Sequence, residues 1–264
     1  MKKIIKNIFK RIEGKKKFQG FFEAFYRFSL AGMNYGNGGN FNESGELQVI
    51  KYLKEKFASE GSIIIFDVGS NAGNYSLILS ELVGSKAIIH SFEPSAKTYK
   101  LFLETTKNKE NIVPHNFGFG DTDQYQILYS NKEGSGLASM YQRNLEHFGI
   151  TMDQIERVQL FTIDAYCKEN NIDRIHFLKI DIEGHELKAL SGAKEMISEN
   201  KIEVIQFEFG GCNIDSRTYF QDFYYLLKDK YRIYRILKDG LFEIPAYKET
   251  YEVFITVNYL AVRK

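Results

Sequence analysis

The sequence predicts an α/β protein built on a doubly wound, mostly parallel β-sheet. After Gly61, short β-branched runs alternate with helical segments, which is the pattern of consecutive βα units. With 44% hydrophobic and 15% aromatic residues, the chain has ample material for a buried core, so wholesale disorder is excluded. A length of 264 residues fits one large domain with an appendage as well as it fits two domains.

The elements follow from hydrophobic periodicity and from turn residues. Five buried strands are expected over 62–68, 87–92, 111–117, 175–181 and 203–209. Helices are expected over 74–82, 95–108, 163–170, 185–199 and 219–228, and residues 125–161 form an insertion of short strands and a loop. Two last strands, 231–237 and 251–262, predict an antiparallel hairpin at the sheet edge.

An extension over residues 1–60 precedes the main domain of residues 61–264. Residues 3–12 place isoleucine and phenylalanine on one stripe of a helix and lysine on the other face. A Gly/Asn-rich loop at 34–45 is either a linker or an active-site flap, and a helix resumes at Glu46.

The formal net charge of +1 conceals an uneven distribution. Residues 1–17 hold eight of the 35 basic residues and one of the 34 acidic ones, so the remaining 247 residues carry a net charge of about −6. An acidic body disfavours a broad nucleic-acid-binding face. The basic amphipathic start is either an in-plane helix on an anionic membrane surface or a helix whose lysines are simply solvated.

The two cysteines, Cys167 and Cys212, form no CxxC motif and fit a reducing compartment. No apolar run approaches the ~18 residues of a membrane span, and lysines interrupt any signal-peptide core. We therefore expect a cytoplasmic protein, with peripheral contact to the inner membrane face through residues 1–17 as an option.

The run IFDVGSNAGNYS at 65–76, between a strand and a helix, predicts a nucleoside-type cofactor site. Gly69 permits a tight turn and Gly73 a close approach of helix and strand, with Ser70 and Asn71 between them. A dinucleotide site requires a glycine where Asn71 stands. An acid at Asp67 would repel a diphosphate but could accept a hydrogen bond from an ammonium group, so the loop favours S-adenosylmethionine over NAD.

Two further acids follow the next strands. Glu93, in Phe-Glu-Pro, lies 20 residues after Gly73, where one carboxylate can accept both hydroxyl groups of a ribose. Asp121 could accept a hydrogen bond from an adenine amino group, although an aspartate that caps its own turn is an equal alternative.

The run FLKIDIEGHE at 177–186 ends the fourth strand with five ionisable residues: Lys179, Asp181, Glu183, His185 and Glu186. Asp181 or His185 could serve as the general base for an alcohol acceptor, with Lys179 holding a carboxylate or the acceptor oxygen. Asp181, Glu183 and His185 could alternatively bind a hard cation, but one acid-rich turn does not establish a metal site, and we expect none. Glu208 is a fourth carboxylate on this edge.

Taken in order, FDVGSNAGNYS, FEP, NFGFGD, LKIDIEGHELKALSGA and IQFEFG resemble the FkbM-type methyltransferases, with NYG and SGE before the first strand and NYLAVRK at the end. The resemblance implies the Rossmann-like class I methyltransferase fold and S-adenosylmethionine as methyl donor. It also implies O-methylation of a hydroxyl on a sugar, glycan or other natural product. By the same resemblance, Asp67–Gly73 and Glu93 would bind the cofactor, and the Lys179/Asp181/Glu183/Glu186 group would lie at the reaction centre.

Three alternatives remain at this point. A nicotinamide-dependent oxidoreductase on a similar sheet is opposed by Asp67 and Asn71, and a nucleic-acid methyltransferase by the acidic body. A scaffold without turnover is opposed by the intact cofactor residues. The acceptor, a small molecule or a glycan, is expected to be selected by residues 18–45, residues 134–150 and the C-terminal hairpin.

Overall fold

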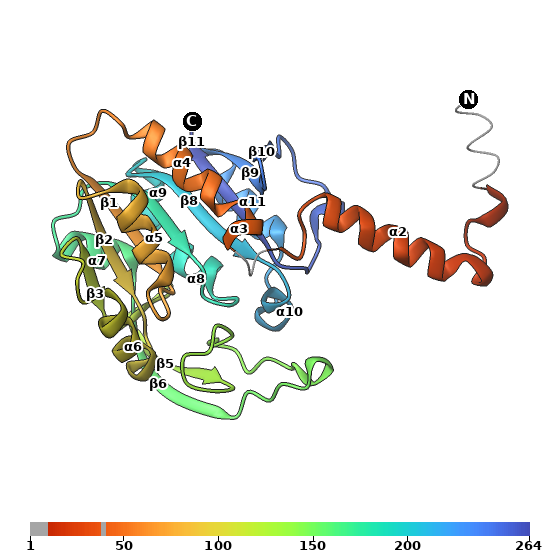
Figure 1. Ribbon diagram of the computed structural model, residues 1–264, viewed down its shortest axis with the longest axis horizontal. Helices are drawn as coiled ribbons and strands as arrows, with labels where there is room; N and C mark the ends of the chain where they lie inside the picture. The colour runs from red at the N-terminus through yellow and green to blue at the C-terminus, as the bar shows by residue number, and fades with distance from the viewer. Residues whose placement is uncertain (1–9, 38–40) are drawn as a thin grey trace.

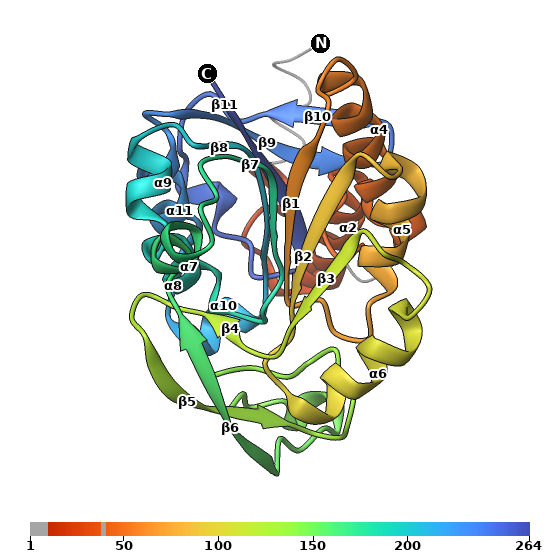
Figure 2. The same cartoon turned by 90° about the vertical axis from the view of Figure 1, so that its left-hand side faces the viewer.

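The computed structural model describes residues 10–37 and 41–264. Its central sheet has eight strands: β1 (Ile63–Val68), β2 (Ala87–Phe92), β3 (Ile112–His115), β7 (Ile175–Ile180), β8 (Ile202–Phe209), β9 (Tyr231–Leu237), β10 (Gly240–Glu243) and β11 (Val257–Arg263). They lie in the order β10-β9-β11-β8-β7-β1-β2-β3. The strands β3, β2, β1, β7 and β8 are parallel, which confirms the doubly wound sheet (Figure 2).

The order reverses between β1 and β7, and this reversal positions the site. The chain runs outward from β1 through β2 to β3 and then returns to β7 on the other side of β1. Loops that leave the carboxyl ends of β1 and β7 therefore diverge, and ligands of open α/β sheets bind in the crevice between such loops.

Helices cover both faces of the sheet (Figure 2). One face packs against α4 (Glu46–Lys56), α5 (Asn74–Val83) and α6 (Ala96–Thr106). The other packs against α7 (Ile163–Glu169), α8 (Glu186–Ser191), α9 (Lys194–Ser198) and α11 (Phe220–Leu227). Within β1, Ile65 belongs to the first core and Phe66 to the second, as the two-residue period of a strand requires. The helix α4, which lies before residue 60, shares a core with β1. The expected division of the chain at residue 60 stays a prediction.

The C-terminal strands pair as expected but with one correction. The strands β9 and β11 are antiparallel neighbours, yet β11 lies between β8 and β9, and the edge is taken by β10, which the sequence analysis missed. A two-residue turn, Lys238-Asp239, joins β9 to β10, so that Gly240 pairs with Leu237. The last strand begins at Val257 rather than at 251, after η3 (Glu249–Tyr251) and an irregular segment.

The helix expected over 185–199 is broken into α8 and α9 at Gly192. Here the backbone of Gly192 lies against the carbonyl group of Gly120, where a side chain would collide, and its own carbonyl oxygen accepts a hydrogen bond from Asp164 N at 2.9 Å. The helical ladder is interrupted because this segment packs directly on its neighbours.

The insertion folds as a second, three-stranded sheet beyond the carboxyl ends of the central strands (Figure 2). It consists of β4 (Gly118–Phe119), β5 (Gln124–Ser130) and β6 (Gln154–Phe161), in the order β4-β6-β5, with η2 (Glu146–Phe148) in the long connection. The structure thus confirms the short strands and the loop that the sequence predicts over residues 125–161.

The start of the chain is partly outside the described residues. The helix expected over 3–12 falls mainly on residues 1–9, which lie outside them; residues 10–12 are helical. After η1 (Lys16–Phe18), the helix α2 (Gln19–Gly32) projects away from the body (Figure 1). Two short helices, α3 (Phe41–Ser44) and α10 (Cys212–Ser216), complete the fold. Within the described residues, no helix has the length and apolarity needed to cross a membrane.

Candidate active site

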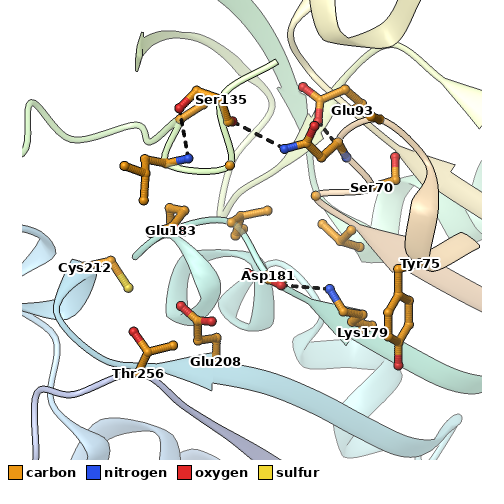
Figure 3. A pocket seen from close by; sticks show the side chains of 18 of the residues that line it. Ser70, Tyr75, Glu93, Ser135, Lys179, Asp181, Glu183, Glu208, Cys212 and Thr256 are labelled. Carbon is orange, nitrogen blue, oxygen red and sulfur yellow. Dashed lines mark hydrogen bonds and ion pairs between the residues drawn. The ribbon is translucent and has the colours of Figure 1, made fainter. Parts of the chain in front are cut away.

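A cavity of about 980 Å³ opens at the carboxyl ends of β1, β7 and β8 (Figure 3). The loop after β1 forms one wall, the turn after β7 forms the floor, and the insertion and the segment before β11 close the sides. This volume lies at the upper end of the ~300–1,000 Å³ typical of ligand pockets, so the cavity has room for a cofactor and part of an acceptor.

The loop after β1 is held tightly against the end of β7. Gly69 has φ +83°, and a Cβ at this position would collide with the carbonyl oxygen of Asp181. Asn71 also has a positive φ, +46°, and its amide N–H donates to Glu93 Oε2 at 3.1 Å. The glycine in the loop is therefore required by both conformation and space.

Glu93 joins this loop to the end of β2. Its second oxygen accepts a hydrogen bond from Ser95 N at 2.9 Å, and only 7% of the residue is exposed. Burial raises the pKa of Glu93 to about 7, although the two backbone N–H donors act in the opposite direction. A carboxylate fixed in this way at a cavity wall is suited to accept hydrogen bonds from vicinal hydroxyl groups.

Residues on the same wall fit S-adenosylmethionine. Ser70 lines the cavity, and its buried hydroxyl has no hydrogen-bond partner among the described residues. The carboxylate of Glu93 and the apolar ring of Phe119 also line this wall. Together they provide acceptors for a ribose and an apolar surface for a purine, and none of the described residues on this wall carries a cationic side chain that would favour a diphosphate.

Three predicted cofactor residues do not line the cavity. Asp67 is fully buried behind the wall, where its carboxylate accepts a hydrogen bond from Ser76 Oγ at 2.6 Å. Gly73 lies at the start of α5, where its backbone lies close to the ring of Phe102. Asp121 forms an ion pair with Lys188 at 2.7 Å. Direct contact of these residues with the cofactor stays a prediction, and the geometry instead gives each of them a local structural partner.

Lys179 and Asp181 form the centre of the floor (Figure 3). Lys179 Nζ lies 2.9 Å from Asp181 Oδ2 and 4.0 Å from Asp67 Oδ1, and it sits 4.6 Å from the ring centroid of Tyr75. Burial alone would lower the pKa of Lys179, but Asp181, Asp67 and Glu46 outweigh it and raise the pKa above its usual value. The ammonium group is therefore a fixed cation, while the Asp181 side chain remains 34% exposed to the cavity.

Glu183 is held by the insertion rather than by its own turn. Its carboxylate forms an ion pair with Arg143, which also lies 3.6 Å from Asp215, and its carbonyl oxygen accepts a hydrogen bond from Ser139 Oγ at 2.7 Å. Its φ of +52° is strained for a residue with a side chain. Burial and the nearby Asp181 raise the pKa of Glu183, and Arg143 opposes them.

Glu186 and His185 have structural environments. Glu186 is fully buried, and its Oε1 accepts hydrogen bonds from Ile182 N at 2.9 Å and Gly184 N at 3.1 Å, which closes the turn after β7. His185 does not line the cavity: its Nδ1 lies 3.2 Å from the hydroxyl of Tyr141. Burial lowers the pKa of His185 to about 4, so the ring is neutral at pH 7. The cavity is therefore lined by Asp181 and not by His185.

The structure places the fourth carboxylate of this edge, which the sequence analysis named without giving it a role, inside the cavity. Glu208, on β8, is 7% exposed and lines the cavity, and no described residue donates a hydrogen bond to its carboxylate. Burial, with Asp181 and Glu183 nearby, raises its pKa well above the usual value. Ligand-type atoms of Glu183, Glu208 and Cys212 lie within 4.8 Å of one another, whereas the trio Asp181, Glu183 and His185 is not brought together around one point.

Glu46, at the start of α4, is a second cavity-lining acid without an assigned role from sequence. It accepts hydrogen bonds from Gln206 Nε2 at 2.9 Å and Ser44 Oγ at 3.0 Å, and burial raises its pKa. The motif Ser44-Gly45-Glu46 was part of the family resemblance, which is the signal that could have identified it. The sequence analysis had already placed Glu208 at this edge by the rule that identified Asp181, because both lie at the ends of central strands.

The strand order and the cofactor side of the cavity define an S-adenosylmethionine-dependent methyltransferase of the class I fold. The chain belongs to the FkbM methyltransferase family: the model of the methyltransferase FkbM domain matches residues 67–236. This finding overturns the alternative of a nicotinamide-dependent oxidoreductase.

Similar proteins are methyltransferases of distant sequence. The hexuronic acid methyltransferase AglP of Haloferax volcanii is 25% identical over 167 residues, which cover 63% of this chain and 64% of that protein. Among solved structures, the S-adenosylmethionine-dependent methyltransferase of Agrobacterium tumefaciens has 7% identity and a TM-score of 0.45, over 83% of this chain and 62% of that chain. Aeropyrum pernix fibrillarin with natively bound S-adenosylmethionine has 11% identity and a TM-score of 0.38, over 77% and 67%.

Proposed function

We propose that the protein is an O-methyltransferase that methylates a hydroxyl group of a sugar, glycan or other natural product. The observation that carries this proposal is the position of Asp181. Its carboxylate is exposed to the cavity between the loop after β1, which fits the cofactor, and the acids Glu183 and Glu208 on the far side. A base between donor and acceptor is what an alcohol nucleophile requires.

When bound, S-adenosylmethionine would supply a methyl group on its sulfonium: the acceptor oxygen would bond to the methyl carbon as the carbon–sulfur bond breaks, and S-adenosylhomocysteine would leave. Most of the rate of such a reaction comes from holding the two reactants in line. Asp181 accepts the hydroxyl proton as the oxygen attacks. Lys179 fixes the orientation of that carboxylate through the 2.9 Å ion pair, and Asp67 behind the wall holds Lys179 in turn.

The acceptor side of the cavity favours a neutral polyol. Glu183 and Glu208 offer acceptor atoms for sugar hydroxyl groups, and the two nearby cations, Lys179 and Arg143, are already paired with carboxylates. Among the described residues that line the cavity, no cation is left unpaired to balance a carboxylate on the acceptor. AglP is named as a hexuronic acid methyltransferase. A neutral acceptor would therefore distinguish the substrate of this chain from the substrate named for that relative.

Replacing Asp181 by asparagine tests the proposed base. We expect kcat to fall by roughly 10²–10⁴-fold, because proton transfer in the transition state is lost, with the affinity for S-adenosylhomocysteine unchanged. Asp173→Asn is the matched control, since Asp173 precedes the same strand at the opposite edge of the sheet and is exposed. Methylation by Asp181→Asn at the wild-type rate would refute the assignment.

A paired acceptor assay tests the substrate class. Neutral saccharides and their hexuronic acid counterparts are offered with labelled S-adenosylmethionine, and the products are analysed by NMR. We expect a methyl ether on the neutral saccharides and a lower kcat/KM for the uronic acids. A methyl ester on a uronic acid carboxylate as the preferred product would contradict the proposal.

A further inference from the structure

The helix α2 presents a row of exposed aromatic side chains to solvent. Phe21, Phe25 and Phe28 recur at the i, i+4 and i+7 spacing of one helix face, and they are 57%, 55% and 74% exposed. The helix projects from the body instead of packing on it, and Leu30 near its end is its one buried residue (Figure 1). Exposed phenylalanines grouped on one face mark a surface that is covered in use.

The chain immediately before this row is basic. Lys10, Arg11 and the run Lys15–Lys17 are all exposed, with Glu13 as the acid among them. Within α2, Glu23 and Arg27 balance each other. The charge is therefore concentrated at the outer end of the projecting arm, next to the aromatic face, while the rest of the molecule carries an excess of acids.

The inner end of the arm is anchored firmly and close to the cavity. Asn34 Nδ2 donates to Ser44 O at 3.0 Å and to Ile236 O at 3.1 Å. Tyr35 is 4% exposed and accepts a hydrogen bond from Arg235 at 3.0 Å, and the next residue, Gly36, lines the cavity. A surface that holds α2 would therefore lie near the mouth of the active site.

We propose that residues 10–32 form a docking arm for an anionic phospholipid bilayer, with the row Phe21/Phe25/Phe28 inserted into the interface and the basic residues on the lipid headgroups. Phenylalanine on one helix face with adjacent lysine and arginine is the pattern of in-plane membrane helices. Negative headgroups attract such cations within a Debye length. The charge favours this occupant over a second copy of the chain, because two parallel arms would bring their basic ends together.

The full-length protein is tested by co-sedimentation with vesicles of phosphatidylcholine, with and without phosphatidylglycerol, at low and high salt. We expect binding to the vesicles with phosphatidylglycerol and weak binding to the neutral ones, and binding that declines as salt rises. Replacing Phe21, Phe25 and Phe28 together by glutamine is expected to lower the partition coefficient by about tenfold or more. These side chains are exposed, so we expect the fold to be preserved, and circular dichroism checks this.

The matched control replaces Ile155 and Ile214 by glutamine, because both are exposed apolar residues on other parts of the surface, at 66% and 60%. This variant is expected to bind vesicles like the wild type. Equal binding of the triple phenylalanine variant would overturn the proposal. The proposal would also be overturned if the wild-type protein did not bind vesicles but formed a dimer or an RNA complex, and if the triple phenylalanine variant no longer formed it. Vesicle binding requires no methyl transfer, so its outcome is independent of the proposed reaction.

Discussion

Gly69 illustrates how much a single position in this site depends on space. Its φ is +83°, and a Cβ would meet the Asp181 carbonyl oxygen and lie 2.9 Å from a methyl carbon of Ile182. Gly84 has nearly the same φ, +88°, but nothing lies within 4 Å of a Cβ there. The pair therefore separates backbone strain from crowding.

We expect Gly69→Ala to cost at least about 2 kcal/mol more of unfolding free energy than Gly84→Ala, because β1 and β7 must move apart. Denaturant unfolding of the two variants measures this difference. Equal destabilisation would mean that the loop after β1 can shift without disturbing β7.

Glu93 makes cofactor affinity sensitive to pH. Its pKa is raised by burial to about 7, and the ionised form is the better acceptor for ribose hydroxyl groups. As the pH falls below 7 the carboxylate of the free protein takes up a proton, so the affinity for S-adenosylhomocysteine should fall with it.

Isothermal titration calorimetry across pH 5.5–8 checks this expectation. Glu93→Gln should bind about tenfold more weakly at pH 8 and lose most of the pH dependence. Glu81→Gln, on the exposed surface of α5, should match the wild type. An affinity of Glu93→Gln equal to the wild type would remove Glu93 from the cofactor site.

At the scale of elements, the insertion is joined to the turn after β7 through Arg143. This side chain is 8% exposed and pairs with Glu183, in the turn after β7, and with Asp215, in α10. Removal of one partner from a buried ion pair leaves an uncompensated charge.

Arg143→Met is therefore expected to destabilise the protein by about 3 kcal/mol and to raise the KM for the acceptor, because Glu183 is no longer held at the cavity. Arg157→Met is the control on the same insertion, since Arg157 is exposed and stacks over Tyr125. Denaturant unfolding and steady-state kinetics measure both effects. An unchanged KM would show that the insertion does not shape the acceptor side.

The same scale explains what could be predicted from sequence. Residues that directly follow central strands, such as Asp181 and Glu93, could be placed because strand ends in a doubly wound sheet meet at one edge. Arg143 could not, because its partner Glu183 is 40 residues away, in the turn that follows a strand of the other sheet. The spacing of His185 placed it near Asp181, but packing against Tyr141 keeps it out of the cavity.

Asp67 shows a related limit. Its position before Gly69 indicated a contact with the cofactor, whereas the fold buries it completely between Ser76 and Lys179. Alternation along a strand identifies the face of a residue but not the side chain that covers it. The strand β10 was missed for a similar reason, since four residues carry too little periodicity.

For the whole molecule, the acidic and basic residues of the chain are concentrated in different parts of the structure. The acids of the body include Asp181, Glu183 and Glu208 at the cavity, and the basic residues precede an aromatic helix that projects from it. The molecule thus combines a cavity rich in carboxyl groups with a positively charged arm. This arrangement favours a neutral acceptor presented near an anionic surface.

A crystal structure with bound S-adenosylhomocysteine tests the central claim most directly. We predict that the ribose hydroxyl groups lie within hydrogen-bond distance of the Glu93 carboxylate and that the sulfur faces Asp181, with open space leading on to Glu183 and Glu208. A bound ligand whose ribose lies away from Glu93, or whose sulfur faces away from Asp181, would contradict the account.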